Sequence, residues 1–118
     1  MKLSIVLSTR PAQFQAATFK GNLETNLSQI AALEYDGVEL AIRDPKLIDL
    51  DQLDELVHKY SLSVPAIGTG QAWGEEGLSF TDPDPKVRFA AIERIKSHIP
   101  VATHICIWQK YPTHFESQ

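Results

Sequence analysis

Three short runs of apolar residues, each ended by proline, glycine or charged residues, mark the first half of the chain. They cover residues 3–7, 38–42 and 63–68. All three are shorter than an ordinary helix and contain several β-branched residues. Continuous apolar runs of this length are typical of parallel strands that are buried on both faces. We therefore predict three parallel strands at these positions.

Apolar residues recur with a helical period in the segments between these runs. Residues 22–33 carry one apolar face behind Asn22, which is a good N-cap residue. Residues 50–60 repeat the pattern, and either Asp49 or Asp51 can cap their first turn. A helix is predicted in each segment.

The second half of the chain predicts a loop, a third helix and a fourth strand. Residues 69–85 contain several glycines and prolines and are expected to form a long loop. Asp84 and Pro85 then suit the start of a helix, which is expected to end at Pro100 because proline lacks the backbone donor that a helix interior needs. Residues 103–108 follow as an apolar, β-prone run.

The order of these elements, strand and helix in alternation, predicts an α/β fold with a parallel sheet. An open doubly wound sheet and a section of a barrel both fit that order. The first strand is not followed by the Gly-x-Gly-x-x-Gly pattern of dinucleotide-binding sheets, which favours the barrel. We expect one domain over residues 1–109 and an irregular tail over residues 110–118.

Composition narrows the classes of partner. The 118 residues carry a formal net charge of −4, with Lys and Arg scattered along the chain, which argues against nucleic acid. Cys106 is the only cysteine, so no intramolecular disulfide forms, and a cytoplasmic location is expected. The N-terminal apolar run is too short for a signal peptide, and no run is long enough to span a membrane.

Two segments resemble the sugar phosphate isomerase/epimerase family, whose members have a xylose isomerase-like barrel. Residues 37–45 read GVELAIRDP and residues 64–74 read VPAIGTGQAWG. The helix that opens with the DPDP of residues 82–85 is also typical of the family. Glu34 stands in a turn where glycine is usual. The resemblance extends over roughly residues 1–99.

The resemblance implies a partial (β/α)8 TIM barrel of about three to four βα units with parallel strands. A complete barrel needs about 250 residues. The family isomerises or epimerises sugars or sugar phosphates with a divalent metal (Mn, Mg, Co or Zn) held by later strands, so no cofactor is expected in this chain. We expect a truncated, catalytically inactive member; a natural truncation, a frameshift and a divergent end all fit. A small stand-alone α/β binding module for a ligand or a protein is the alternative.

Barrel enzymes place their sites at the carboxyl ends of the strands, which selects the candidate residues. The substrate-binding candidates are Glu39, Arg43, Gln71, Trp73 and Glu75. A carboxylate in an apolar strand, such as Glu39, needs either a structural partner or a ligand. The ligand implied by the resemblance is a sugar or sugar phosphate.

Three of the other candidates have a structural alternative. Arg43 can clamp a phosphate or simply pair with Asp44. Trp73 can stack on a sugar ring or plug the mouth of the barrel, and Glu75 can be a solvated loop acid. His104 and Cys106, alternating on the predicted fourth strand, are too few to make a metal site.

A partial barrel leaves sheet edges and apolar strand faces uncovered. Such surfaces favour association, so a homo-oligomer formed through exposed sheet edges is expected. An active site that is completed across such an interface is a further possibility, but no residue gives positive evidence for it.

Overall fold

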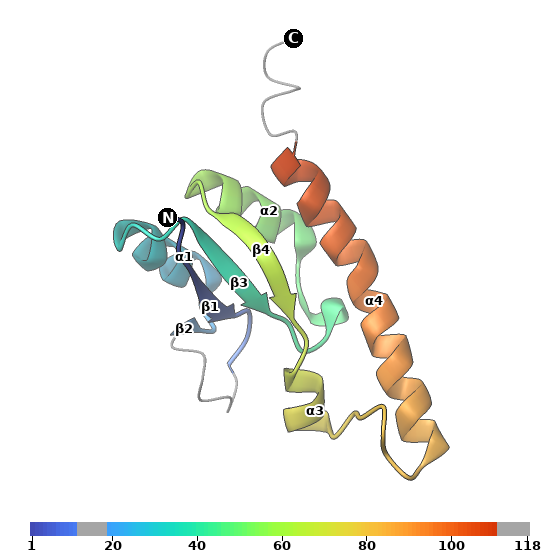
Figure 1. The fold of residues 1–118 in the computed structure, drawn as a ribbon. Coiled ribbons are helices and arrows are strands. Elements are labelled where there is room, and N and C mark those ends of the chain that lie inside the picture. Colours follow the sequence, from blue (N-terminus) through green and yellow to red (C-terminus); the bar gives the residue numbers. More distant parts are fainter. Residues whose placement is uncertain (12–18, 111–118) are drawn as a thin grey trace.

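The sheet has four strands, and all of its pairings are parallel. The structure, a computed structural model, describes residues 1–11 and 19–110, with side chains described as far as residue 105. The strands follow the order β2-β1-β3-β4 (Figure 1). Their bounds are Ser4–Ser8 for β1, Phe19–Lys20 for β2, Gly37–Ala41 for β3 and Ser63–Gly68 for β4. The prediction of an α/β fold with a parallel sheet is confirmed.

The register of β1 and β3 separates a helix-covered face of the sheet from an open one. Leu7 lies opposite Leu40, and Val6 lies opposite Glu39. Successive residues of a strand point to opposite faces, so each pair shares one face. Leu7 and Leu40 are fully buried, whereas Val6 and Glu39 are half-buried. We call the face that carries Val6 and Glu39 the open face.

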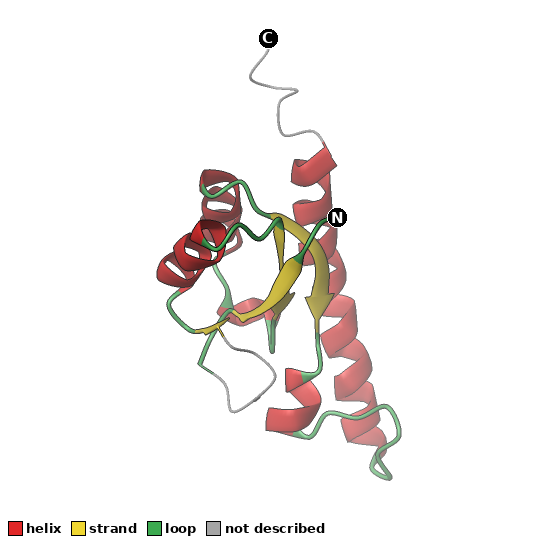
Figure 2. Cartoon of the chain, turned by 60° about the vertical axis from the view of Figure 1, so that its left-hand side comes forward, coloured by secondary structure: helices red, strands yellow, loops and turns green. Residues whose placement is uncertain are grey.

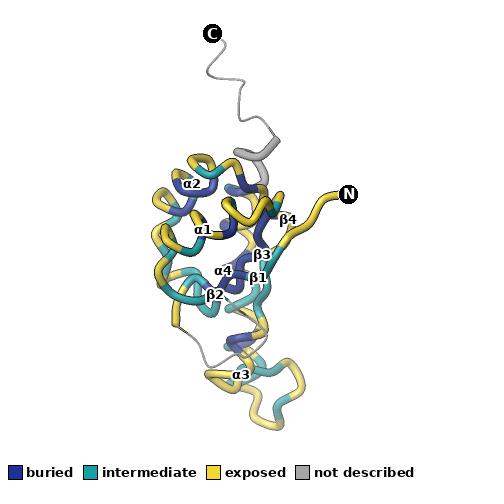
Figure 3. Tube along the Cα trace, turned by 90° about the vertical axis from the view of Figure 1, so that its left-hand side faces the viewer, coloured by how far each residue is buried: buried dark blue, intermediate teal, exposed yellow. Residues whose placement is uncertain are grey.

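The hydrophobic core lies between the other face and the helices. Figure 3 shows α1 and α2 together on one side of the strands, and Figure 2 shows the strands as a single twisted layer. Among the described residues no helix packs on the open face. Burial of the apolar side chains of this core, which contributes about 25 cal/mol per Å² of apolar surface, is the main stabilisation of the fold. The core consists of Leu7, Leu27, Ile30, Val38, Leu40, Ile42, Leu53, Leu56, Val57, Leu62, Val64, Val101 and Ile105.

Helix α1, Leu23–Ala32, begins as the sequence predicts. The side chain of Asn22 accepts a hydrogen bond from the backbone N–H of Thr25 at 3.2 Å. At its other end the N–H of Glu34 donates to Ala31 O and the N–H of Tyr35 donates to Ile30 O. This pair of bonds is a Schellman motif, which requires a left-handed residue, and Glu34 supplies it with φ of 65°.

Helix α2, Leu50–Lys59, follows the short 3-10 helix η1, Pro45–Leu47. Asp49 is the N-cap, and its side chain accepts from the N–H of Gln52 at 3.1 Å. The helix also ends in a Schellman motif, with Ser61 in the left-handed conformation at φ of 53°. Helices α1 and α2 therefore both end in a Schellman motif whose left-handed residue is not a glycine.

Helix α4 corrects two predictions, because it runs over Pro85–Lys110 without ending at Pro100. The strand predicted at residues 103–108 is therefore wrong. Pro100 is exposed, so the carbonyl four residues earlier that loses its partner can bond to water. Val101 and Ile105 are buried and extend the same helical stripe. Burial of this stripe against β4 outweighs the local β propensity and the cost of the proline.

Two further elements differ from the predictions. The segment 69–85, expected to be loop throughout, contains the short helix α3, Gln71–Glu76. Strand β2 was not predicted; only two residues long, it pairs with Leu7 and Ser8 at the edge of β1. The predicted tail is not tested beyond Lys110, which is the last residue of α4, because residues 111–118 lie outside the described part of the chain. Within that part, no helix has the length and apolar character needed to cross a bilayer.

Candidate functional site at the carboxyl ends of the strands

Glu39 is the most unusual side chain of the sheet. It lies in the middle of β3 on the open face, where it is half-buried. It forms no hydrogen bond or ion pair within the described residues, so the structural partner that the sequence left open is not found there. A free carboxylate at a sheet surface can accept hydrogen bonds from a bound ligand.

The neighbouring strand makes room for this carboxylate. Gly68, at the end of β4, lies so close that a Cβ built on it would be 3.3 Å from Glu39 Oε1. In the register, Gly68 lies opposite Ala41, two residues further along β3 than Glu39. The glycine thus leaves the space that the carboxylate of Glu39 occupies.

Gln71 contacts the last residue of β1. Its amide nitrogen donates to Ser8 Oγ at 2.9 Å, and both side chains are buried. Ser8 Oγ in turn donates to the carbonyl of Arg10 at 2.7 Å. Because Ser8 lies opposite Ala41 in the register, it is on the same face as Glu39. This bond fixes the first turn of α3 at the strand ends. The substrate-binding candidate Gln71 therefore has a structural partner.

Arg43 and Glu75 are brought together, but they pair with each other. Arg43 Nη1 lies 3.3 Å from Glu75 Oε2, and its Nε lies 3.7 Å from Glu76 Oε2. The longer distance is an ion pair without a hydrogen bond. The expected pairing of Arg43 with Asp44 does not form, and the charge of Arg43 is directed to α3.

Arg94, which the sequence did not single out, connects this cluster to α4. It donates two hydrogen bonds to Glu76, at 2.5 and 3.0 Å, and one to the carbonyl of Arg43 at 2.9 Å. Its Nη2 also lies 3.4 Å from Asp44. Hydrogen bonding to Arg94 is the main reason that the pKa of Glu76 is below its usual value. No local pattern could have found this contact, since Arg94 lies 51 residues from Arg43.

Trp73 lies apart from Glu39 because it projects from α3 on the side away from Gln71. Residues two apart on a helix point in nearly opposite directions. Trp73, 70% exposed, borders a cavity of about 250 Å³ between α3 and α4, together with Phe80 and Ile95. The structure therefore does not bring Trp73 to the carboxylate on the open face.

The described residues include no cluster of three or more His, Cys, Asp or Glu side chains that could hold a metal ion. The predicted alternation of His104 and Cys106 is wrong, because both lie in α4. His104 instead pairs with Asp54 of α2. The side chain of Cys106 lies outside the described residues. The metal of a complete family member stays a prediction.

A polar hollow of about 250 Å³, lined in part by Thr9, lies beyond the end of β1 and was not predicted from the sequence. Arg10, Asp49 and Gln52 also line it. Arg10 is held there by a hydrogen bond of 3.2 Å from Nη1 to the carbonyl of Leu47. It is the guanidinium nearest in sequence to the strand end that carries Ser8.

The arrangement offers one carboxylate that has no partner among the described residues, together with polar side chains at the strand ends. Such a site can accept hydrogen bonds from the hydroxyl groups of a small ligand. No family model and no curated protein matches this sequence. The resemblance to sugar phosphate isomerases therefore stays a prediction.

Proposed function

We propose that this chain is a section of a (β/α)8 barrel that binds a sugar at the carboxyl ends of its strands without isomerising it. Three features support the barrel. The sheet is all-parallel, β1, β3 and β4 are adjacent in chain order, and the helices that cover it share one face. A doubly wound sheet places helices on both faces.

The observation that carries the ligand site is the carboxylate of Glu39, which has no partner among the described residues. Keeping a half-buried carboxylate unpaired is costly, since such groups are normally paired or hydrogen-bonded. Glu39 Oε1 lies beside Gly68, and the polar pair of Ser8 and Gln71 lies at the same ends of the strands. In barrel enzymes this is the position of substrate.

The charges favour a neutral sugar over a sugar phosphate. A phosphate needs a cation, and the candidate Arg43 already pairs with Glu75 and Glu76. Glu39 itself repels an anion. The hydroxyl groups of a sugar, in contrast, are donors that a carboxylate binds well.

The absence of turnover follows from the number of available acid–base groups. Isomerisation through an enediol requires a base that moves a proton between neighbouring carbons and a second group that polarises the carbonyl and moves a proton between the oxygens. Of the three described candidates near the strand ends, Glu75 and Glu76 are held by arginines, and only Glu39 has no partner among the described residues. Glu39 can serve as the base, but neither of the other two is free to act at the oxygens, so the chain alone is expected to bind and release its ligand unchanged.

The proposal is tested by calorimetric titration with D-fructose and, separately, D-fructose 6-phosphate and Mn²⁺. We expect D-fructose to bind more tightly than its phosphate, and Glu39→Gln to weaken it about tenfold, because a charged hydrogen bond is worth about 1.5–3 kcal/mol. Glu55→Gln, an exposed carboxylate of α2, is the matched control and should leave binding unchanged. Equal binding by wild type and Glu39→Gln, or none, would overturn the proposal.

A further inference from the structure

The outer edge of β4 is open. The N–H of Ser63 donates to Asp36 O, and Gly68 O accepts from the N–H of Ile42, so these groups point to β3. Since backbone groups alternate along a strand, the N–H and C=O of Ile67 point to the outer edge. No further strand follows β4 in the described sheet.

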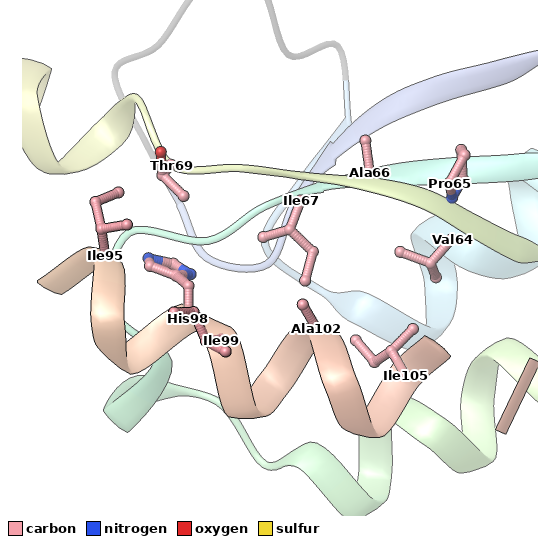
Figure 4. Close-up of a pocket in the computed structure, with 10 residues that line it drawn as sticks. All are labelled: Val64, Pro65, Ala66, Ile67, Thr69, Ile95, His98, Ile99, Ala102 and Ile105. Atoms are coloured by element: carbon pink, nitrogen blue, oxygen red, sulfur yellow. The ribbon is translucent and has the colours of Figure 1, made fainter. Parts of the chain in front are cut away.

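Beside this edge lies a hollow that we call the β4–α4 groove. Its volume is about 320 Å³, and its walls are the side chains of β4 and one face of α4 (Figure 4). None of the residues that line it is Asp, Glu, Lys or Arg. The groove is lined by Val64, Pro65, Ala66, Ile67, Thr69, Ile95, His98, Ile99, Ala102 and Ile105.

His98 is the unsatisfied polar group of this groove. It is 5% exposed, and neither ring nitrogen has a hydrogen-bond partner. Figure 4 shows its ring between Ile95 and the strand, close to Thr69. Leaving a buried polar group without a partner costs about 1–3 kcal/mol. A backbone group placed in the groove by another chain would satisfy it.

The apolar surface continues on both sides of the groove. On α4, Ile99 is 60% exposed and Ile92 is 43% exposed. At the α3 end, the cavity beside Trp73 and Phe80 shares Thr69 and Ile95 with the groove, so the two hollows are contiguous. The exposed parts of these two aromatic rings alone amount to about 200–300 Å². Monomeric proteins rarely expose contiguous apolar patches larger than a few hundred Å².

We propose that a second copy of this chain docks on the β4–α4 groove, across a twofold axis that passes near Ile99. A twofold contact places each residue close to the axis beside its own copy, so charged residues there would repel. Ile95, Ile99 and Ala102 are uncharged and therefore suit this position. Each copy offers an open strand edge and an apolar helix face, so the same two surfaces of both copies can meet across the axis.

The dimensions agree with a stable dimer. β4 is about 20 Å long at 3.3 Å per residue, and the face of α4 from Ile92 to Ile105 is equally long at 1.5 Å per residue. The exposed parts of Trp73, Phe80, Ile92 and Ile99 amount to about half of the roughly 800 Å² per partner of a standard interface, and the walls of the groove add to them. Pro65 can donate no backbone bond, so strand pairing centres on Ile67 and side-chain burial supplies most of the affinity.

The test is the mass in solution, measured by size-exclusion chromatography with light scattering. The wild-type chain should have twice the monomer mass of 13.2 kDa, and Ile99→Glu should have the monomer mass. Leu33→Glu is the matched control, because Leu33 is 62% exposed at the end of α1, which lies at the opposite edge of the sheet from α4. This variant should remain a dimer, and circular dichroism should show all three proteins folded.

Hydrogen exchange gives a second readout that does not depend on mass. The amide of Ile67 should exchange at least tenfold more slowly in the wild type than in Ile99→Glu. A wild-type monomer, or a dimer that Ile99→Glu leaves intact, would overturn the proposal. Loss of the dimer in both variants would point to non-specific association and would overturn it as well. Binding of D-fructose at Glu39, on the open face, is expected to be unchanged by Ile99→Glu, so the two proposals fail separately.

Discussion

Glu39 Oε1 lies where a side chain at Gly68 would begin, 3.3 Å from the Cβ position of that glycine. Two residues on adjacent strands thus share one space: the glycine leaves it and the carboxylate occupies it. The pairing explains why a charged side chain is accommodated within the sheet.

Gly68→Ala should therefore change ligand binding more than stability. The new methyl group forces the flexible carboxylate to move by a few tenths of an ångström, so we expect a loss of less than about 1 kcal/mol in the free energy of unfolding. Affinity for D-fructose should fall several-fold. Gly37→Ala is the contrast, because its Cβ would lie 2.7 Å from the carbonyl oxygen of Ser63, which cannot move freely. That variant should lose about 1–3 kcal/mol in urea unfolding.

The two Schellman motifs predict stabilising substitutions. Glu34 and Ser61 hold positive φ values of 65° and 53°, which cost a residue with a Cβ about 1–2 kcal/mol. Glycine avoids this cost but loses more backbone entropy on folding. Glu34→Gly and Ser61→Gly should each raise the free energy of unfolding by about 0.5–1 kcal/mol. Glu55→Gly, inside α2, should lower it by about 1 kcal/mol, and the same sign for all three would contradict the motif.

Continuity of α4 through Pro100 is open to a direct test. A proline inside a helix costs about 3 kcal/mol, part of which its exposed position avoids. Pro100→Ala should therefore raise the free energy of unfolding by about 1–3 kcal/mol and increase the helical signal in circular dichroism. Pro45→Ala, at the first position of η1 where proline is favourable, should slightly lower stability. No gain from Pro100→Ala would mean that the helix ends at this residue.

Burial of His98 predicts a dependence of stability on pH. Burial lowers the pKa of His98 below 6.5, and Arg94 adds to the effect while Asp44 opposes it. The unfolded chain therefore binds a proton that the folded chain resists. Stability should be constant above about pH 7.5 and fall as the pH drops through 6.5. His98→Leu should remove this slope and leave the loss near pH 4 that follows from the lowered pKa of Glu76. An unchanged slope would show that another group titrates.

The sequence predicted the elements whose local signals agree with their tertiary roles. β4 matches its expected bounds, and Asn22 and Asp49 cap the helices as their side chains suggest. Strands β1 and β3 are each shifted by one residue. These segments combine apolar runs with clear stop signals, so little depends on distant contacts.

Where local and tertiary preferences conflict, the sequence misled. Residues 103–108 have β propensity and follow a proline, yet Val101 and Ile105 gain burial only if the helix continues. Helix α3 could not be predicted because its anchor, the bond between Gln71 and Ser8, joins residues 63 positions apart.

The candidate site was predicted in part for the same reason. Glu39 stands out as a carboxylate within an apolar run, and within the described part of the chain it stays unpaired. Arg43 and Glu75 were selected for their position at strand ends, but their neutralisation by each other and by Glu76 depends on how α3 packs. Sequence position identifies which residues reach the strand ends, whereas packing decides which of them stay free.

The most direct test of the central claim is a two-dimensional ¹H–¹⁵N NMR titration of the chain with D-fructose. If the carboxyl ends of the strands form the ligand site, the amide signals of Glu39, Ala41, Gly68 and Gln71 should shift together with one dissociation constant, and Glu39→Gln should raise that constant about tenfold. Shifts confined to residues between β4 and α4, or an unchanged dissociation constant in Glu39→Gln, would contradict the account.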